Sequence, residues 1–161
     1  MPVKSALKSR IIDEKDKKIL HILQENGREQ LNKIAKKVGL SIDSTHNRIK
    51  VMIEKGIFHP TILIDPRAIG FPLIADVKIK LKNVSQKALD DVISHMKKHP
   101  RCIELLSIMG DYDFTIVLIA KDGDELEKLS MEIRQKYKDL IDEWKSNLVL
   151  KTHKFEEYLL E

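Results

Sequence analysis

The sequence has a single cysteine, Cys102, among its 161 residues. One cysteine cannot form an intrachain disulfide or a cysteine-rich zinc site. No apolar run approaches the roughly 18 residues needed to span a bilayer, and residues 1–10 lack the apolar segment of a secretory signal. We therefore expect a cytoplasmic protein that has no membrane partner.

Motifs of catalysis are also missing. The six glycines are spread singly, with no GxGxxG or GK[ST] loop for phosphate, and no nucleophile lies beside a base. His95 and His99 are four residues apart, in one row with Asp91, which is close to metal-ligand spacing. No further Cys or His is placed as a third ligand. Histidines near the C-terminus of a helix also interact favourably with its dipole, which explains His95 and His99 without a metal. We expect a protein that is not an enzyme and holds no metal or cofactor.

Charge is distributed unevenly along the chain, which is long enough for two small domains. The net charge is +4. Residues 1–70 hold 14 Lys and Arg against 8 Asp and Glu, whereas residues 71–161 hold 15 against 17. The basic excess therefore lies in the first part, where counterion release would favour binding to a nucleic acid.

Helical periodicity predicts three short helices after a basic arm at residues 1–10. Asp13 caps the first, and Asn26-Gly27 ends it. Gly39 provides a tight turn between the second and third helices, and the third begins at Ser41. The residues expected on the buried sides are Ile19, Leu20 and Leu23, then Leu31, Ile34, Ala35 and Val38, then Ile42, Ile49, Met52 and Ile53.

This arrangement, at residues 11–57, is typical of a helix-turn-helix, whose last helix enters the major groove of double-stranded DNA. Side chains on the third helix can donate to or accept from bases and phosphates, and a valine can touch a thymine methyl. An ordinary solvated helix surface is the alternative. The candidate DNA-binding residues are Ser41, Ser44, Thr45, Asn47, Arg48, Lys50, Val51 and Lys55.

The sequence predicts a β-strand linker or hinge at residues 58–71, which contain Pro60 and Pro66. From residue 72 to residue 161 the pattern is strand, helix, strand, strand, helix, strand, with the last strand at about Ser146 to Lys154. The predicted fold class is α+β: an N-terminal helix-turn-helix (winged-helix-like) domain followed by a ferredoxin-like βαββαβ domain. Its uncovered sheet face is expected to offer Val, Ile and Leu and to pair with a second copy.

Several motifs together resemble the Lrp/AsnC family of leucine-responsive, feast/famine transcription regulators. They are ILHILQENGR (19–28), IAKKVGLS (34–41), RIK (48–50), EKGI (54–57), IDPRAIG (64–70) and GDYD (110–113). The resemblance implies a transcription regulator that dimerises through its ferredoxin-like domain, often assembles further to octamers, and binds DNA through paired helix-turn-helix units. It also implies an amino acid or related effector near Gly110, Asp111, Tyr112 and Asp113.

Other interpretations remain open at this stage. Gly and Asp favour tight turns, which explains the sequence at 110–113 without a ligand. A metabolite-binding module without DNA activity is one alternative function, and a tetrapyrrole decarboxylase of related fold is another. The basic excess of the first 70 residues favours the regulator.

Overall fold

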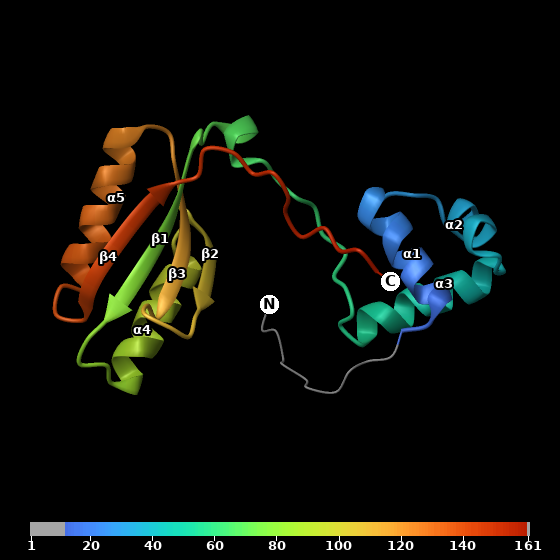
Figure 1. Ribbon diagram of the computed structural model, residues 1–161, viewed down its shortest axis with the longest axis horizontal. Coiled ribbons are helices and arrows are strands. Elements are labelled where there is room, and N and C mark those ends of the chain that lie inside the picture. Colours follow the sequence, from blue (N-terminus) through green and yellow to red (C-terminus); the bar gives the residue numbers. More distant parts are fainter. Residues whose placement is uncertain (1–11, 161) are drawn as a thin grey trace. The chain divides into compact units, whose positions relative to one another are not determined.

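The computed structural model describes residues 12–160, which fold as two compact units (Figure 1). Of the described residues, the first unit comprises 12–62 together with 154–160, and the second comprises Leu63–His153. The basic arm predicted for residues 1–10 lies outside the described residues. Between residues 12 and 160, no helix combines the length and apolar character needed to cross a membrane.

The first unit is built from three helices: α1 at Glu14–Glu25, α2 at Leu31–Val38 and α3 at Ile42–Glu54. A capping box starts α1, because the Asp13 carboxylate accepts from the Asp16 N–H at 2.9 Å and the Asp16 carboxylate accepts from the Asp13 N–H at 3.3 Å. The helices enclose a small core of Ile19, Ile34, Val38 and Met52. This arrangement confirms the helix-turn-helix predicted from periodicity.

The turn between α2 and α3 depends on Gly39. Its backbone adopts the left-handed conformation, with φ 69° and ψ 51°, and its N–H donates to the Ala35 carbonyl. Residues with a Cβ adopt this conformation at a cost, whereas glycine adopts it freely. Two residues later Ser41 caps α3, so the chain changes direction within three residues.

The segment after α3 differs from the prediction. Residues 57–65 form no β-strand, so neither the predicted strand of the linker nor a wing is present in the described chain. A strand needs a partner for its backbone groups, and Pro60 has no N–H to donate. The chain instead enters a short 3₁₀-helix, η1 at Pro66–Ile69, which Asp65 caps by accepting from the Arg67 N–H at 3.0 Å.

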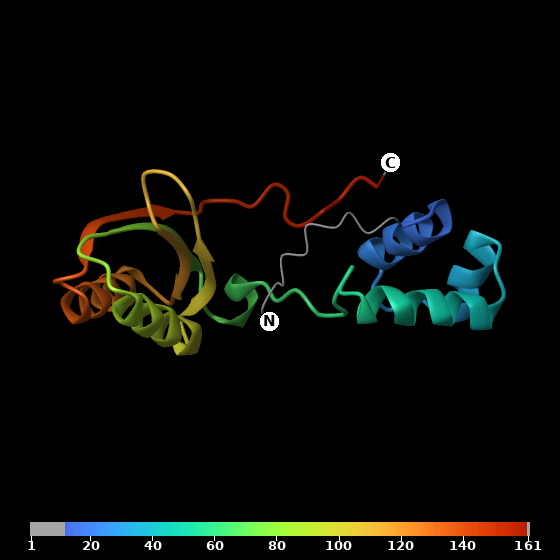
Figure 2. The same ribbon diagram turned by 90° about the horizontal axis from the view of Figure 1, so that it is seen from below.

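The second unit is a four-stranded antiparallel sheet whose strand order is β2-β3-β1-β4. Figure 2 shows both helices of this unit on one face of the sheet. This confirms the ferredoxin-like fold. Its elements are β1 at Leu73–Leu81, α4 at Gln86–Lys98, β2 at Cys102–Ser107, β3 at Phe114–Ala120, α5 at Gly123–Lys136 and β4 at Ile141–Leu148.

Alternation along the central strands supplies the core of this unit. Val77 on β1 lies opposite Ile116 on β3, and both are fully buried beneath the helices. Val92 and Met96 of α4 and Ile133 of α5 close the core from the helical side. The period of two in the sequence therefore identified the buried face of β1 correctly.

The last strand begins earlier than predicted, at Ile141 rather than near Ser146. The Ile141 N–H donates to the Tyr137 carbonyl at 2.8 Å, so the chain turns directly from the end of α5 into β4. Trp144 pairs with Ile79, and Lys145 pairs with Lys78. The charged residues of this edge strand conceal its alternation, which explains the error in the prediction.

The sheet face away from the helices is more polar than predicted. Lys78 Nζ donates to Asp76 Oδ1 at 3.1 Å and to Thr115 Oγ1 at 2.9 Å, and Thr115 Oγ1 donates to Asp76 Oδ1 at 2.7 Å. Val117 lies opposite Asp76, and Leu106 lies opposite Thr115, so apolar side chains border this polar cluster. The expectation of a largely apolar face was wrong, because the outward positions of β1 are occupied by charged residues.

We expect Gly39→Ala to lower the free energy of unfolding by about 1–2 kcal/mol, because a Cβ disfavours the left-handed backbone. The space itself is adequate, since an added Cβ would lie 3.5 Å from Lys15 Nζ. Denaturant titration followed by the helical circular dichroism signal measures the change.

Gly27→Ala in the same unit is the matched control, because Gly27 is not among the glycines with positive φ. An added Cβ there would lie 3.6 Å from the Leu23 carbonyl oxygen, which is ordinary contact. Equal effects of the two substitutions would contradict the role assigned to the Gly39 backbone.

Candidate nucleic-acid interface

The N-terminus of α3 is held by two serines. The Ser44 N–H donates to Ser41 Oγ at 3.1 Å, and Ser41 Oγ donates to Ser44 Oγ at 2.9 Å. Both residues are exposed. Because Ser41 and Ser44 stabilise the first turn of the helix, their hydroxyls are oriented before any partner is bound.

Thr45 does not belong to the exposed surface, contrary to its place among the candidate DNA-binding residues. Its exposed fraction is 0%, and Thr45 Oγ1 donates to the Ser41 carbonyl at 2.9 Å. Ile42, which was expected to be buried, is 51% exposed. The inward side of α3 is thus centred on Thr45 and Met52, and a threonine can be buried there because the helix backbone satisfies its hydroxyl.

The outward side of α3 carries Ser44, Asn47, Val51 and Lys55. These positions are separated by three or four residues, so they lie along one face of the helix, and all four are exposed. The Asn47 side chain has no hydrogen-bond partner within residues 12–160. An amide with two donors and an acceptor is therefore available to a ligand at the middle of this face.

Lys50 lies at the edge of the same face, where its side chain is 63% exposed. Its Nζ is 3.9 Å from Glu54 Oε1, which is a weak surface ion pair. A phosphate oxygen can replace such a partner at little cost. Lys50 and Lys55 thus remain candidates for contact with phosphates.

Arg48 is bound within the protein, and this changes the role expected for it. Its Nη1 donates to Asp13 Oδ2 at 2.6 Å and to Asp16 Oδ1 at 2.8 Å, and its side chain is 34% exposed. These hydrogen bonds raise the pKa of Arg48. The pKa of Asp13 is lowered, first by the N–H of Asp16 and then by Arg48. Arg48 therefore ties α3 to the start of α1.

The sequence predicted Asp13 as the cap of the first helix, but it did not predict that Asp13 and Asp16 contact Arg48. They are 35 and 32 residues from Arg48 in the chain, so no local pattern connects the three. A similar long-range contact joins Lys15 to the end of α2, where Lys15 Nζ donates to the Val38 carbonyl. A cation at the C-terminus of α2 also interacts favourably with the dipole of that helix.

The second candidate site is the turn between β2 and β3. Figure 2 shows this connection projecting on the side of the sheet away from the helices. Gly110 has φ 148°, which favours glycine. Asp113 is used structurally, because its Oδ2 accepts from the Leu81 N–H at 2.7 Å and its N–H donates to the Ile79 carbonyl at 3.0 Å. Asp111 is exposed and Tyr112 is half-buried.

The two histidines with metal-ligand spacing lie beside each other, and His95 also lies beside Tyr137. The ring of His95 lies 5.8 Å from that of His99 and 5.6 Å from that of Tyr137, whose hydroxyl donates to Asp91 Oδ2 at 3.1 Å. Burial lowers the pKa of both histidines, which favours their neutral forms. Within residues 12–160 no three His, Cys, Asp or Glu side chains are grouped to hold a metal ion.

An exposed polar helix on a three-helix unit, followed by a ferredoxin-like unit, defines a two-domain helix-turn-helix regulator. Two family models match these units. The AsnC-type helix-turn-helix domain matches residues 12–53, and the Lrp/AsnC ligand binding domain matches residues 74–159.

Known proteins agree with this assignment. The HTH-type transcriptional regulator FL11 of Pyrococcus horikoshii is 33% identical over 89% of this chain and 92% of its own length. The crystal structure of an AsnC family transcriptional regulator from Agrobacterium tumefaciens is 26% identical, covers 92% of this chain and 97% of that one, and has a TM-score of 0.81. A transcriptional regulator from Neisseria meningitidis, solved as a complex with L-Met, has the same fold at 23% identity and a TM-score of 0.80, covering 90% of this chain and 94% of that one.

The chain therefore belongs to the Lrp/AsnC family. It is a DNA-binding transcription regulator with a domain that responds to a small molecule. The resemblance predicted from its sequence motifs is confirmed.

We expect Asp13→Asn to lower the midpoint of thermal unfolding at neutral pH, because Arg48 loses one of its two charged partners. Asparagine still caps a helix, so the substitution removes charge and leaves the cap. Since the folded-state pKa of Asp13 is lowered, its charge stabilises the native state above the ordinary pKa of 3.8. That stabilisation is lost as the pH falls below 3.8, so the difference between the two proteins should narrow there.

Asp43→Asn is the control, because Asp43 lies in the first turn of α3 and its side chain makes no ion pair within the described chain. The measurement is the unfolding midpoint at neutral pH and at about pH 3. A difference between Asp13→Asn and the unmodified protein that is the same at both pH values would argue against the ion pair with Arg48.

Proposed function

We propose that the chain binds double-stranded DNA as a homodimer, with the exposed face of α3 in the major groove. The observation that carries this proposal is the outward row of Ser44, Asn47, Val51 and Lys55 on a helix whose other side is buried. A two-fold axis would place two such helices about 34 Å apart, or a multiple of this distance, on a roughly palindromic operator. Dimers of family members often assemble further to octamers, and we extend this assembly to the present chain.

We assign different tasks to the residues of this face. Ser44, Asn47 and Val51 contact base edges, because an amide reads adenine and an aliphatic group fits the thymine methyl. Ser41, Lys50 and Lys55 contact phosphates. Arg48 sets the position of α3 through Asp13 and Asp16 rather than reading a base itself. The similar regulators named above come from cells without a nucleus, whose DNA lies in the cytoplasm, so we place this protein there.

We further propose that the small molecule is an amino acid or a related metabolite, bound at the turn Gly110–Asp113. The exposed carboxylate of Asp111 is suited to an ammonium group, whereas the carboxylate of Asp113 already accepts from the Leu81 N–H. The Neisseria regulator was solved with L-Met, which supports an amino acid as the class of ligand. A ligand that prefers one assembly state changes DNA occupancy by its difference in affinity for the two states.

Asn47→Ala and Lys50→Ala should weaken DNA binding in different ways. For Asn47→Ala we expect the binding free energy to weaken by about 1–3 kcal/mol on an operator obtained by genomic binding-site selection. Binding to a scrambled duplex should change little. For Lys50→Ala we expect weaker binding to both duplexes, with a salt slope smaller by about one unit. Fluorescence anisotropy over a range of salt concentrations measures both quantities.

Lys87→Ala is the matched control, because Lys87 is an exposed lysine on α4 of the second unit. It should leave both the affinity and the salt slope unchanged. An equal loss of affinity for both duplexes in Asn47→Ala would indicate that Asn47 contacts phosphates rather than bases.

Asp111→Asn should reduce the response of DNA binding to the amino acid that acts on the unmodified protein. The measurement is operator affinity across a panel of amino acids that begins with methionine. Asp124→Asn, at an exposed acidic residue in the first turn of α5, is the control and should respond normally. An unchanged response of Asp111→Asn would exclude this carboxylate from the effector site.

A further inference from the structure

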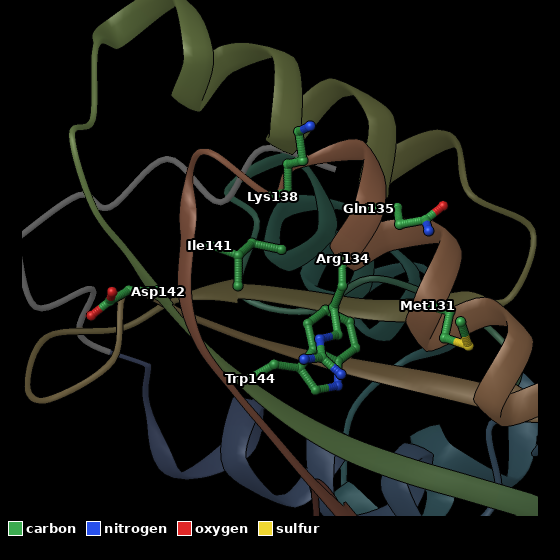
Figure 3. A pocket seen from close by; sticks show the side chains of 7 residues that line it. All are labelled: Met131, Arg134, Gln135, Lys138, Ile141, Asp142 and Trp144. Atoms are coloured by element: carbon green, nitrogen blue, oxygen red, sulfur yellow. The ribbon is translucent and has the colours of Figure 1, made fainter.

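A groove between α5 and the edge strand β4 is not used by either proposed site. Its volume is about 390 Å³, within the range of small-molecule pockets, and it is open to solvent (Figure 3). Four residues of its wall come from α5 and the turn that follows it, and three from the start of β4. The lining residues are Met131, Arg134, Gln135, Lys138, Ile141, Asp142 and Trp144.

The groove exists because α5 presents two faces. Its core face carries Leu126, Ile133 and Tyr137, which pack beneath the sheet. Met131 and Arg134 lie on the adjacent face, above β4, where no further strand or helix follows because β4 is the edge of the sheet. In the part of the chain that the structure describes, no strand beyond β4 covers this second face.

The floor of the groove is firmly held. Ile141 and Trp144 both pack against the core of the second unit, and Trp144 pairs with Ile79 on the neighbouring strand. Figure 3 shows Arg134 reaching from α5 in the direction of Trp144, whereas Lys138 and Asp142 extend outward at the rim. An indole and a guanidinium therefore border the same space on a rigid base.

Hydrogen-bond donors line this space without protein acceptors. Within residues 12–160 the side chains of Arg134, Gln135 and Lys138 take part in no hydrogen bond or ion pair. The one acid of the lining, Asp142, is outnumbered by Arg134 and Lys138, and its Oδ1 lies 3.7 Å from Lys82 Nζ in a weak surface ion pair. The groove thus has an excess of positive charge and of donors.

We propose that this groove binds a small aromatic carboxylate, with the carboxylate on Arg134 and the ring against Trp144. The guanidinium presents two parallel N–H groups that match a carboxylate, and an aromatic ring stacks on an indole. The ligand class and the location both differ from the amino-acid site proposed at Gly110–Asp113.

The chain has one tryptophan, so the fluorescence of the full-length protein reports on Trp144 alone. Titration with phenylacetate should change its intensity or emission maximum in a saturable way. Acetate has the charge without the ring, and 2-phenylacetamide has the ring without the charge. Both should bind at least about tenfold more weakly, because each removes one of the two interactions.

Arg134→Gln should weaken phenylacetate binding by at least about tenfold, whereas the control Lys128→Gln, on α5 outside the groove, should bind normally. Trp144→Phe, followed by calorimetry, should retain weaker binding that depends on Arg134. Equal titrations for Arg134→Gln and Lys128→Gln, equal binding of 2-phenylacetamide, or no response at millimolar phenylacetate would overturn the proposal. The assay contains no DNA, and Arg134 and Trp144 belong to neither the proposed operator contacts nor the effector site. Its outcome is therefore independent of those two proposals.

Discussion

The orientation of α3 depends on the burial of one narrow side of that helix. Met52 lies in the core with residues of α1 and α2, and Thr45 is buried about two turns earlier. The Thr45 hydroxyl bonds to the backbone of its own helix, so its burial leaves no donor unsatisfied. Because a helix advances about 100° per residue, this single packing choice turns Asn47 and Val51 outward. The surface available to DNA is thus a consequence of the core.

A second constraint acts across the same helix. Arg48 lies between the outward row and the core, and it is bound to two carboxylates at the start of α1. Their charges offset that of the guanidinium, so much of the positive charge on this face comes from Lys50 and Lys55. The face therefore combines neutral groups suited to bases with a small number of cations suited to phosphates. Such a balance favours discrimination between sequences over general attraction to DNA.

The two faces and the edge of the sheet in the second unit differ in what they expose. The helices cover one side of the sheet, and the other side carries a hydrogen-bonded cluster of Asp76, Lys78 and Thr115 bordered by apolar side chains. The turn at Gly110–Asp113 projects beyond that side, whereas the groove at Trp144 lies between α5 and the edge strand. The two ligand sites that we propose thus lie at separate positions on one small fold.

The sequence by itself determined the helix-turn-helix, the ferredoxin-like order of the second unit and the family. A period of 3.6 residues in a helix, or of 2 in a strand, shows which side is apolar. The burial of Ile34 and Val77 could therefore be predicted without knowing which elements pack against them. The sequence did not give the start of β4, and it predicted a strand at residues 57–65 that the structure lacks. It also did not show that the chain returns to the first unit from Lys154. It also listed Thr45 among the DNA-binding residues and did not predict the ion pairs of Arg48. Only the tertiary structure decided these points, because strand pairing, burial of a polar side chain and an ion pair over 35 residues depend on groups that are distant in the chain.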